Sequence, residues 1–314
     1  MENMKAVRIH QYGGPDELKI EDVPRPQPGA GEVLIQVHAA GVNPIDWKLR
    51  AGYLKAYMPV PMPFIPGIDV AGVVEAAGLG VARFKRGDEV FGVGSGTYAQ
   101  FAIAKESELA LKPGSIDAVR AAAIPLAALT AWQALFNVAH LTAGQKVLIH
   151  GAAGGVGGFA AQFAKAKGAH VFGTASGRNQ AFLRELGVDE PIDYEKTKFE
   201  NVAHEVDVVL DTQGGDTQQR SWKVLKKAGI LVSVIQPPSA EEAAKHGVKS
   251  AMVARQPNAG ELGEIAKLVE AGKVKPLVET SLPLAEVKRA HELSQTGHVR
   301  GKIVLKVAQL KSSD

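Results

Sequence analysis

The chain has 314 residues, of which 46% are hydrophobic and 22% charged, and its formal net charge is +3. This composition is typical of a folded globular protein and excludes a largely disordered one, and the length favours two domains. The sequence contains no cysteine, which excludes disulfides, a thiolate nucleophile and cysteine-ligated zinc.

The mild net charge gives no argument for binding to nucleic acid. No apolar stretch is long enough to predict a membrane span, and the first residues do not have the pattern of a signal peptide. We therefore expect a cytoplasmic protein with neither a membrane nor a nucleic acid partner.

The N-terminal part of the chain has a β-rich pattern. Short apolar runs are separated by turn signals such as Gly13-Gly14-Pro15 and Arg86-Gly87-Asp88. Strands are predicted over residues 5–10, 18–23, 32–40, 71–77, 89–92 and 98–104. Many short strands with this punctuation predict a compact barrel.

From about residue 124 onward, helical and strand patterns alternate. Helices are predicted over 129–140, 179–186, 216–227 and 261–271, and strands over 146–150, 169–174, 190–193, 206–211 and 229–235. This alternation predicts an α/β fold with a doubly wound parallel sheet. Residues 236–256 have no clear period and are expected to form a loop.

The last segments, a strand over 277–280, a helix over 284–296 and a strand over 302–307, are predicted to return to the barrel. The sequence therefore predicts two domains. Residues 1–123 and 272–314 form the barrel domain, and residues 124–271 form a Rossmann-type dinucleotide-binding domain.

A glycine-rich turn follows the strand over 146–150. Gly151, Gly154 and Gly157 have the spacing G-x-x-G-x-x-G, and a helix with an apolar period begins near Gly155. Positions without a Cβ let backbone N–H groups approach a pyrophosphate at the positive end of that helix. The turn residues predicted to bind the cofactor are Ala153, Gly154, Gly155 and Val156.

The next strand ends at Thr174, which is itself a predicted cofactor contact, without the acidic residue that usually binds the 2′-hydroxyl of NAD. Ser176 can donate a hydrogen bond to a phosphate, and Arg178 can offer a charge-assisted fork to it. Tyr194 follows the third strand and is a further candidate. We therefore predict NADP(H), although Arg178 can equally be a solvated residue of the next helix and Tyr194 a surface aromatic.

Further cofactor contacts are expected at the carboxyl ends of the later strands, because doubly wound sheets bind ligands there. Thr212 follows the strand over 206–211, and Ile235 and Gln236 follow the strand over 229–235. These three residues are predicted to contact the nucleotide.

With these motifs in place, the chain resembles the medium-chain dehydrogenase/reductase superfamily, and within it the zinc-free quinone oxidoreductases. The resemblance covers residues 4–307 and includes the segments FIPGIDVAGVV, GDEVFG, AAAIPLAALTAWQAL, GAAGGVG and GHVRGKIVL. It implies a GroES-like catalytic barrel interrupted by a Rossmann domain, and NADPH-dependent reduction of small-molecule quinones. The chain is also similar to NADPH-dependent enone and alkenal reductases, which reduce α,β-unsaturated carbonyls.

The superfamily resemblance also implies a homodimer through the edge of the dinucleotide sheet, around residues 231–235. An apolar strand there can equally be buried within one subunit.

The chain departs from zinc-dependent relatives at their metal site. Where those place a zinc-binding cysteine it has Gly41-Val42-Asn43-Pro44, and where they have Gly-His-Glu it has Gly67-Ile68-Asp69. A catalytic zinc needs three protein ligands, which Asp69 alone does not supply, so no metal is expected. Asp46 and Asp69 are interpreted as structural residues that fix this loop.

The resemblance implies four catalytic candidates. Asn43 can hydrogen-bond a carbonyl or a carboxamide, or simply occupy a turn before Pro44. Lys48 can stabilise an enolate or be an exposed lysine, and Tyr53 can stack on a planar acceptor or pack as an ordinary aromatic. Thr130 corresponds to a position near the nicotinamide, and its hydroxyl can instead cap a helix.

Two other functions remain open from the sequence. The chain could be a non-catalytic NADPH-binding protein with a regulatory or RNA-binding role, as crystallin relatives suggest. It could also reduce carrier-linked enoyl thioesters.

Overall fold

The computed structural model describes residues 2–307. Within them the chain forms two units. The first unit comprises the residues up to Leu126, residues 257–271 and the chain from Pro276 onward. The second unit comprises residues 127–256 and 272–275.

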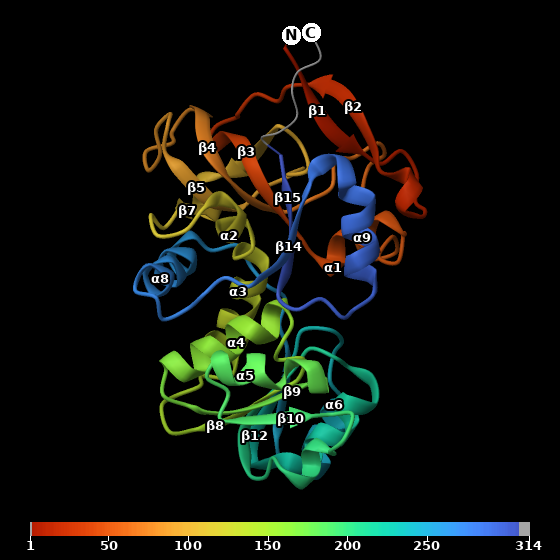
Figure 1. Cartoon of the computed structure of the whole chain (residues 1–314), viewed down its shortest axis with the longest axis vertical. Coiled ribbons are helices and arrows are strands. Elements are labelled where there is room, and N and C mark those ends of the chain that lie inside the picture. Colours follow the sequence, from red (N-terminus) through yellow and green to blue (C-terminus); the bar gives the residue numbers. More distant parts are fainter. Residues whose placement is uncertain (1, 308–314) are drawn as a thin grey trace. The chain divides into compact units, whose positions relative to one another are not determined.

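The first unit is built from two mainly antiparallel sheets (Figure 1). Its strands are β1 (Asn3–Arg8), β2 (Lys19–Pro24), β3 (Glu32–Val42), β4 (Asp69–Ala77), β5 (Glu89–Val93), β6 (Phe101–Lys105), β7 (Leu109–Leu111), β14 (Val278–Pro283) and β15 (Lys302–Lys306). The larger sheet has the order β14-β15-β3-β4-β5-β7, and β6 also pairs with β3. Strands β1 and β2 form the smaller sheet, and only the pair β14–β15 is parallel.

The long strand β3 is central to this unit because it pairs with β4, β6 and β15 and its apolar residues are buried. Val33, Ile35 and Val37 are almost completely buried, in one core with Val70 of β4 and Leu305 of β15. The closing strand β15 pairs antiparallel with β3. The last segments therefore return to the barrel, as the sequence predicted.

Several helices complete the first unit. They are α1 (Pro44–Arg50), α2 (Ala118–Ala122), the start of α3 (Pro125–Trp132), α8 (Ala259–Glu270), α9 (Val287–Gln295) and the short 3₁₀ turns Pro15–Glu17, Glu106–Glu108 and Leu284–Glu286. Arg50 is buried at the end of α1 and donates hydrogen bonds to the Gly13 carbonyl at 3.2 Å and to the Gln295 side chain at 3.0 Å. It thereby fixes α1 against α9.

The second unit is a six-stranded parallel sheet with the order β10-β9-β8-β11-β12-β13 (Figure 1). Its strands are β8 (Lys146–Ile149), β9 (His170–Ala175), β10 (Glu190–Asp193), β11 (Val206–Asp211), β12 (Leu225–Ser233) and β13 (Lys249–Met252). Its helices are α4 (Gly155–Ala166), α5 (Gln180–Glu185), α6 (Gly215–Ser221) and α7 (Ala240–His246), with short 3₁₀ turns at Gly177–Asn179, Phe199–Asn201 and Trp222–Val224 and a π-helical turn at Gln133–Val138. The predicted Rossmann-type topology is confirmed.

Residues 236–256, predicted to be a loop, instead contain α7 and β13. The side chain of Ser239 caps α7 by accepting a hydrogen bond from the Glu242 N–H at 3.2 Å, and Gly247 ends the helix in the left-handed conformation with φ 64°. Elements as short as α7 and β13 give no clear periodicity, so the sequence analysis did not predict them.

The position of β13 also corrects the predicted dimer edge. Strand β12 pairs with both β11 and β13, and Leu231 within it is fully buried. Residues 231–235 therefore do not form a sheet edge, and the alternative that the strand is buried within one subunit holds. The outer strand on that side is β13.

Two element boundaries differ from the sequence prediction. The helix predicted over 216–227 ends at Ser221, because Leu225 already has an extended backbone that begins β12. Helix α8 was assigned to the dinucleotide domain but clusters with the first unit, where the Ser115 hydroxyl donates to a Glu270 carboxylate oxygen at 2.9 Å. No helix in residues 2–307 has the length and apolar character needed to cross a membrane.

Candidate functional site

The glycine turn between β8 and α4 has the tight geometry that the sequence predicted. Gly151 has a positive φ of 65°, and a Cβ there would lie 2.6 Å from the Thr212 hydroxyl oxygen. A Cβ on Gly157 would lie 2.8 Å from the Ala152 Cα, so the helix packs directly on the turn. Gly154 is the N-cap of α4, whose first-turn N–H groups have no partner within a helix and suit an anion.

The predicted turn residues all lie at this helix start. Ala153 is buried, whereas Gly154, Gly155 and Val156 are half-buried and give their backbone access to a ligand. The local geometry therefore fits the pyrophosphate of a dinucleotide.

A buried histidine, which the sequence analysis did not select, supports the turn. His150 Nε2 lies 2.9 Å from the Ser221 hydroxyl oxygen, and that hydroxyl donates to the Thr217 carbonyl at 2.7 Å. Since the Ser221 proton is used, Nε2 must carry the histidine proton and Nδ1 must accept. Nδ1 lies 3.2 Å from the Thr174 hydroxyl, which accepts the Gly151 N–H at 3.3 Å.

This chain of hydrogen bonds requires a neutral imidazole, and burial lowers the pKa of His150 to about 4. Thr174, predicted to contact the cofactor, is buried with its hydroxyl between His150 and Gly151. The structure thus places Thr174 behind the turn.

The carboxyl ends of β11 and β12 meet beside the glycine turn. The Thr212 hydroxyl donates to the His150 carbonyl at 2.7 Å, and Ile235 is 45% exposed. The Gln236 side chain lies 3.2 Å from the position of a Cβ on Gly214. The predicted nucleotide contacts Thr212, Ile235 and Gln236 therefore share one edge of the sheet with the turn.

The proposed 2′-phosphate residues also gather at neighbouring strand ends. Ser176 and the exposed Arg178 follow β9, and the Tyr194 N–H donates to the Ala175 carbonyl at 3.3 Å. Tyr194 is 53% exposed, as its alternative interpretation as a surface aromatic requires.

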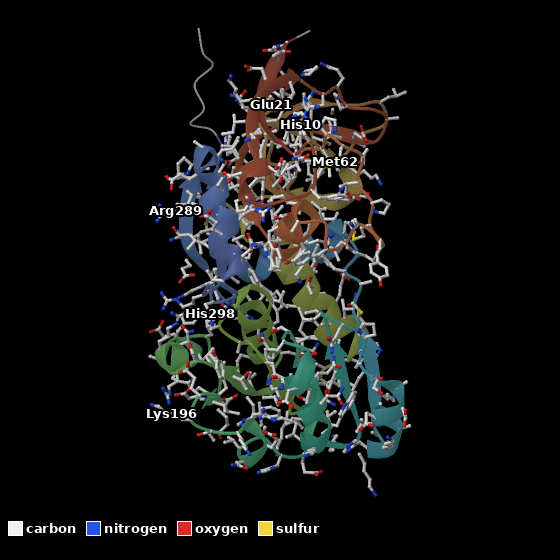
Figure 2. The ribbon with its side chains drawn as sticks, turned by 90° about the vertical axis from the view of Figure 1, so that its right-hand side faces the viewer. His10, Glu21, Met62, Lys196, Arg289 and His298 are labelled. Carbon is white, nitrogen blue, oxygen red and sulfur yellow. The ribbon has the colours of Figure 1, made fainter. Side chains whose placement is uncertain are left out.

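Two carboxylates that the sequence analysis did not consider lie in the same region. The Gly177 N–H donates to Glu195 Oε2 at 3.2 Å, and a Cβ on Gly177 would lie 2.9 Å from Asp193 Oδ2. Lys196, which projects at the surface of this unit in Figure 2, lies 3.8 Å from Asp193. The end of β9 is therefore flanked by acidic groups from the end of β10, although β9 itself ends without one.

In the first unit, the candidate residues belong to helix α1 and its flanks. Asn43 is the N-cap residue, Pro44 begins the helix, and Asp46 Oδ2 accepts the Asn43 N–H at 2.8 Å. Asn43 is only 1% exposed. The turn role that the sequence left open for Asn43 is therefore present.

A buried network surrounds Asn43. Its Nδ2 donates to Asp69 Oδ2 at 2.9 Å, and Lys302 Nζ donates to Asn43 Oδ1. The Tyr98 hydroxyl donates to Asp46 Oδ2 at 2.8 Å. Burial raises the pKa of Asp46 to about 7. Both Asp46 and Asp69 accept hydrogen bonds from Asn43.

Lys48 and Tyr53 both lie close to the ring of Trp47. Lys48 Nζ is 5.7 Å from the Trp47 ring, and the Tyr53 ring is 5.6 Å from it in an edge-on arrangement. Tyr53 is 69% exposed and offers its ring to a ligand. Thr130 is buried inside α3, five residues after its start at Pro125, so the alternative in which its hydroxyl caps the helix start is wrong.

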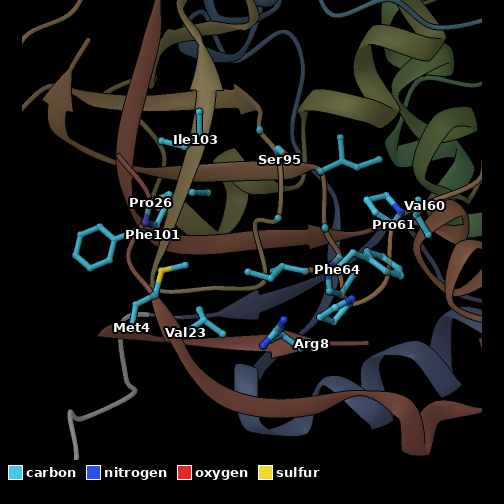
Figure 3. Close-up of a pocket in the computed structure, with 18 of the residues that line it drawn as sticks. Met4, Arg8, Val23, Pro26, Val60, Pro61, Phe64, Ser95, Phe101 and Ile103 are labelled. Atoms are coloured by element: carbon cyan, nitrogen blue, oxygen red, sulfur yellow. The ribbon is translucent and has the colours of Figure 1, made fainter. Parts of the chain in front are cut away.

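An apolar pocket of about 650 Å³ lies within the first unit. Figure 3 shows Met4, Val60 and Phe64 among its lining side chains, with Arg8 also at the wall. Buried Asp46 lines the same pocket. Its walls suit an uncharged, largely apolar molecule.

Sequence reasoning missed His150, Glu195 and Lys302. Lys302 had a visible signal, because it is the one charged residue in the apolar run 302–305 of the closing strand. Glu195 had none, since its partner Gly177 precedes it by 18 residues, in the turn after another strand. Across residues 2–307, no three His, Cys, Asp or Glu side chains form a group that could hold a metal ion.

Comparisons with known proteins place this geometry in a family. Residues 29–114 match the alcohol dehydrogenase GroES-like domain, and residues 186–305 match a zinc-binding dehydrogenase domain. The chloroplast envelope quinone oxidoreductase homolog of Arabidopsis thaliana is 35% identical, and the match covers 96% of this chain and 98% of that protein. The chain belongs to the quinone oxidoreductase family of the medium-chain dehydrogenase/reductase superfamily.

Two further matches support this membership. The chloroplastic NADPH-dependent alkenal/one oxidoreductase of Arabidopsis thaliana is 36% identical over 96% of this chain and 79% of that protein. The solved quinone oxidoreductase of Coxiella burnetii is 38% identical with a TM-score of 0.90, covering 98% of this chain and all of that one. As an oxidoreductase of this family, the protein uses a nicotinamide cofactor.

We expect Gly157→Ala to abolish nucleotide binding while leaving the protein folded, because the new Cβ would push α4 away from Ala152. The measurement is a titration of NADPH fluorescence, with circular dichroism to verify the fold. Gly263→Ala is the matched control, since Gly263 lies within helix α8 with open space around its Cβ position. That variant should bind normally and gain about 0.5–1 kcal/mol of stability. Normal binding by Gly157→Ala would contradict the close-packed turn.

We expect acid to weaken the protein through His150. Its folded-state pKa, about 4, lies below the ordinary value of 6.5 for a histidine, so the neutral form stabilises the fold above pH 6.5 and this contribution is lost as the pH falls toward 4. The loss should reach about 3 kcal/mol in urea unfolding.

His150→Gln should flatten the pH dependence of stability in this window. A residual slope should remain from His291, because burial lowers its pKa to about 3. An identical slope in the variant and the parent would show that His150 does not titrate as described.

Proposed function

We propose that the protein is an NADPH-dependent reductase that transfers hydride to quinones or α,β-unsaturated carbonyls without a metal. The observation that carries the proposal is the tight glycine turn of the second unit, in a chain whose relatives are named quinone oxidoreductases and an alkenal/one oxidoreductase. Bound NADPH would supply the hydride, and the acceptor's own conjugation would spread the resulting negative charge.

The residues of the chain would bind and orient the reactants. The first-turn N–H groups of α4 would hold the pyrophosphate, and Thr212 and Gln236 would flank the nucleotide at the strand ends. Alignment of this kind supplies on the order of 7–11 kcal/mol to a reaction between two bound molecules. No general base is therefore required.

The acceptor side would be provided by the first unit. The exposed ring of Tyr53 suits stacking on a planar acceptor, and Lys48 beside it offers a positive charge to a developing enolate. The apolar pocket with Phe64 and Val60 in its wall supports an apolar acceptor rather than a charged one. Thr130 is kept as a candidate near the nicotinamide on the strength of the family resemblance.

The preference for NADP(H) over NAD(H) would rest on Ser176, Arg178 and Tyr194 at the ends of β9 and β10. A guanidinium and a hydroxyl are suitable partners for a 2′-phosphate. Glu195 opposes them, because its carboxylate occupies the Gly177 N–H and carries a charge of the same sign as the phosphate. We therefore propose a preference for NADPH that Glu195 limits.

We also propose that the protein acts in the cytoplasm as a homodimer on a small-molecule acceptor, with neither a nucleic acid nor a membrane partner. The mild net charge of +3 supports the absence of a nucleic acid partner. A dimer formed through the sheet edge would use β13 instead of residues 231–235.

The function is tested by following NADPH absorbance with 9,10-phenanthrenequinone and with a reactive enone such as an alkenal. We expect oxidation of NADPH with at least one of them and much slower oxidation of NADH. Equal rates with both nucleotides would remove the cofactor preference. Tight NADPH binding without turnover of any quinone or enone would replace the proposal with a non-catalytic binding role.

Two variants test the nucleotide specificity. Arg178→Ala should raise the KM for NADPH roughly ten-fold and leave the KM for NADH unchanged, because it removes a charge-assisted contact worth about 1.5–3 kcal/mol. Glu195→Gln should lower the KM for NADPH alone, since it removes the opposing charge. Arg289→Ala, on the exposed face of α9, is the control and should change neither constant. A parallel change for both nucleotides would exclude a role in reading the 2′-phosphate.

A further inference from the structure

Asp211, at the carboxyl end of β11, is a fully buried carboxylate to which two loops are hydrogen-bonded. Its Oδ1 accepts the backbone N–H groups of Gln213 at 2.9 Å and Gly214 at 2.8 Å, in the loop that follows β11. Its Oδ2 accepts the Ser233 hydroxyl and Gln218 Nε2, both at 2.9 Å. Because a buried carboxylate is strongly disfavoured without donors, these four hydrogen bonds hold it in one orientation.

The two donors to Oδ2 connect Asp211 to the loop that follows β12. The Ser233 hydroxyl accepts the N–H groups of Ile235 at 3.3 Å and Gln236 at 3.4 Å. Gln218 Nε2 also donates to the Gln236 carbonyl, at 3.4 Å. One carboxylate therefore fixes the backbone of both loops.

Side chains of both loops are accessible at the edge of the sheet that carries the glycine turn. Gln213 and Gln236 are exposed, and Ile235 is 45% exposed. A Cβ on Gly151 would lie 2.5 Å from Gln213 Nε2, so this loop directly borders the turn. A ligand at the turn can therefore reach the loops that Asp211 fixes, although it cannot reach the buried carboxylate.

The order of the strands indicates which half of a dinucleotide would lie over these loops. The glycine turn follows β8, and the proposed 2′-phosphate residues follow β9 and β10 on one side of it. Strands β11 and β12 lie on the other side of β8. With the pyrophosphate at the turn and the adenosine half over β9, the nicotinamide half would extend over the ends of β11 and β12.

We propose that Asp211 is a positioning residue for the nicotinamide half of the bound nucleotide. This inference rests on the proposed function, and within it only on the binding of NADPH. Asp211 holds the loops after β11 and β12 in one arrangement, so that Gln213, Ile235 and Gln236 meet the nucleotide without first being ordered. Such preordering raises affinity, because a site that is in its binding arrangement only part of the time binds proportionally more weakly.

The test compares NADPH with adenosine 2′,5′-bisphosphate, which has the adenosine half and the 2′-phosphate but no nicotinamide. Each oxygen of Asp211 accepts from two donors, so in Asp211→Asn the amide nitrogen would face two donors in either orientation. If the loops then keep their arrangement about one-tenth of the time, the Kd for NADPH rises about ten-fold. We expect this rise in a fluorescence titration, with the Kd for adenosine 2′,5′-bisphosphate unchanged in calorimetry.

Asp207→Asn is the matched control, because Asp207 lies at the other end of the same strand. Asp207 is 8% exposed, accepts the Lys146 N–H at 2.8 Å and forms an ion pair with Lys226. This variant should lose stability in urea unfolding and yet bind both ligands as the parent protein does. An equal loss of NADPH affinity in Asp207→Asn and Asp211→Asn would overturn the positioning role, because general destabilisation would explain both.

Ser233→Ala breaks the same connection with a smaller change and no change of charge. It removes one donor to Asp211 and the acceptor of the Ile235 and Gln236 N–H groups. We expect a weaker affinity for NADPH, with the Kd for adenosine 2′,5′-bisphosphate again unchanged. In the Asp211→Asn background, Ser233→Ala should cost less NADPH affinity than it does alone. An unchanged Kd for NADPH in Ser233→Ala would overturn the proposal even if Asp211→Asn does not fold.

Measurements on the parent protein separate this inference from the proposed function. Tight binding of NADPH without turnover of any quinone or enone would overturn the proposed function alone, since the inference depends only on binding. A parent protein that binds NADPH but not adenosine 2′,5′-bisphosphate would overturn the placement of the adenosine half over β9, and the inference with it. Equal losses of affinity for the two ligands in Asp211→Asn would overturn a role at the nicotinamide half.

Discussion

A buried charge must be paired, and this requirement organises the first unit around the ion pair of Asp69 and Lys302. The carboxylate lies on β4 and the ammonium on β15, and between them they bind Asn43, Val42 and the backbone N–H of Leu126. Removing one member would leave the other uncompensated in the core, which typically costs 3–5 kcal/mol. The ion pair of Asp69 and Lys302 therefore holds the start of α1, and the loss of either partner would destabilise this region.

The second unit depends instead on a buried side chain that must stay uncharged, the imidazole of His150. His150 connects the glycine turn through Thr174 to helix α6 through Ser221, and each bond in this series has one possible direction. A proton on Nδ1 would turn an acceptor into a donor facing the Thr174 hydroxyl. The geometry of the glycine turn thus depends on the buried, neutral imidazole of His150 behind it.

Much of the second unit followed from sequence because its signals are local. The glycine spacing, the apolar period of α4 and the strands on either side lie within about thirty residues, the usual span of a βαβ unit, so their geometry is set by neighbours along the chain. The short elements α7 and β13 did not give a period long enough to detect. Glu195 reaches Gly177 only because β10 lies beside β9, which spacing alone does not reveal.

In the first unit, the candidate residues of α1 were found by family resemblance, but their partners were not. Asn43 and Lys302 are 259 residues apart, and no local pattern links them. The sequence suggested that Asp69 fixes a loop, whereas the direction of the Asn43 amide could be read only from which partner donates and which accepts. Pairing over long separations is the information that single-sequence reasoning lacks.

The discontinuity of the first unit has a consequence for its biosynthesis. Strand β15 is the last strand described, and it supplies both the partner of β3 and the ammonium that faces Asn43. During translation, the parallel sheet of the second unit can assemble before β15 is available to pair with β3. Until then, Asp69 lacks the ammonium of Lys302 as its partner. Packing around β3 in the first unit therefore follows assembly of the parallel sheet of the second unit.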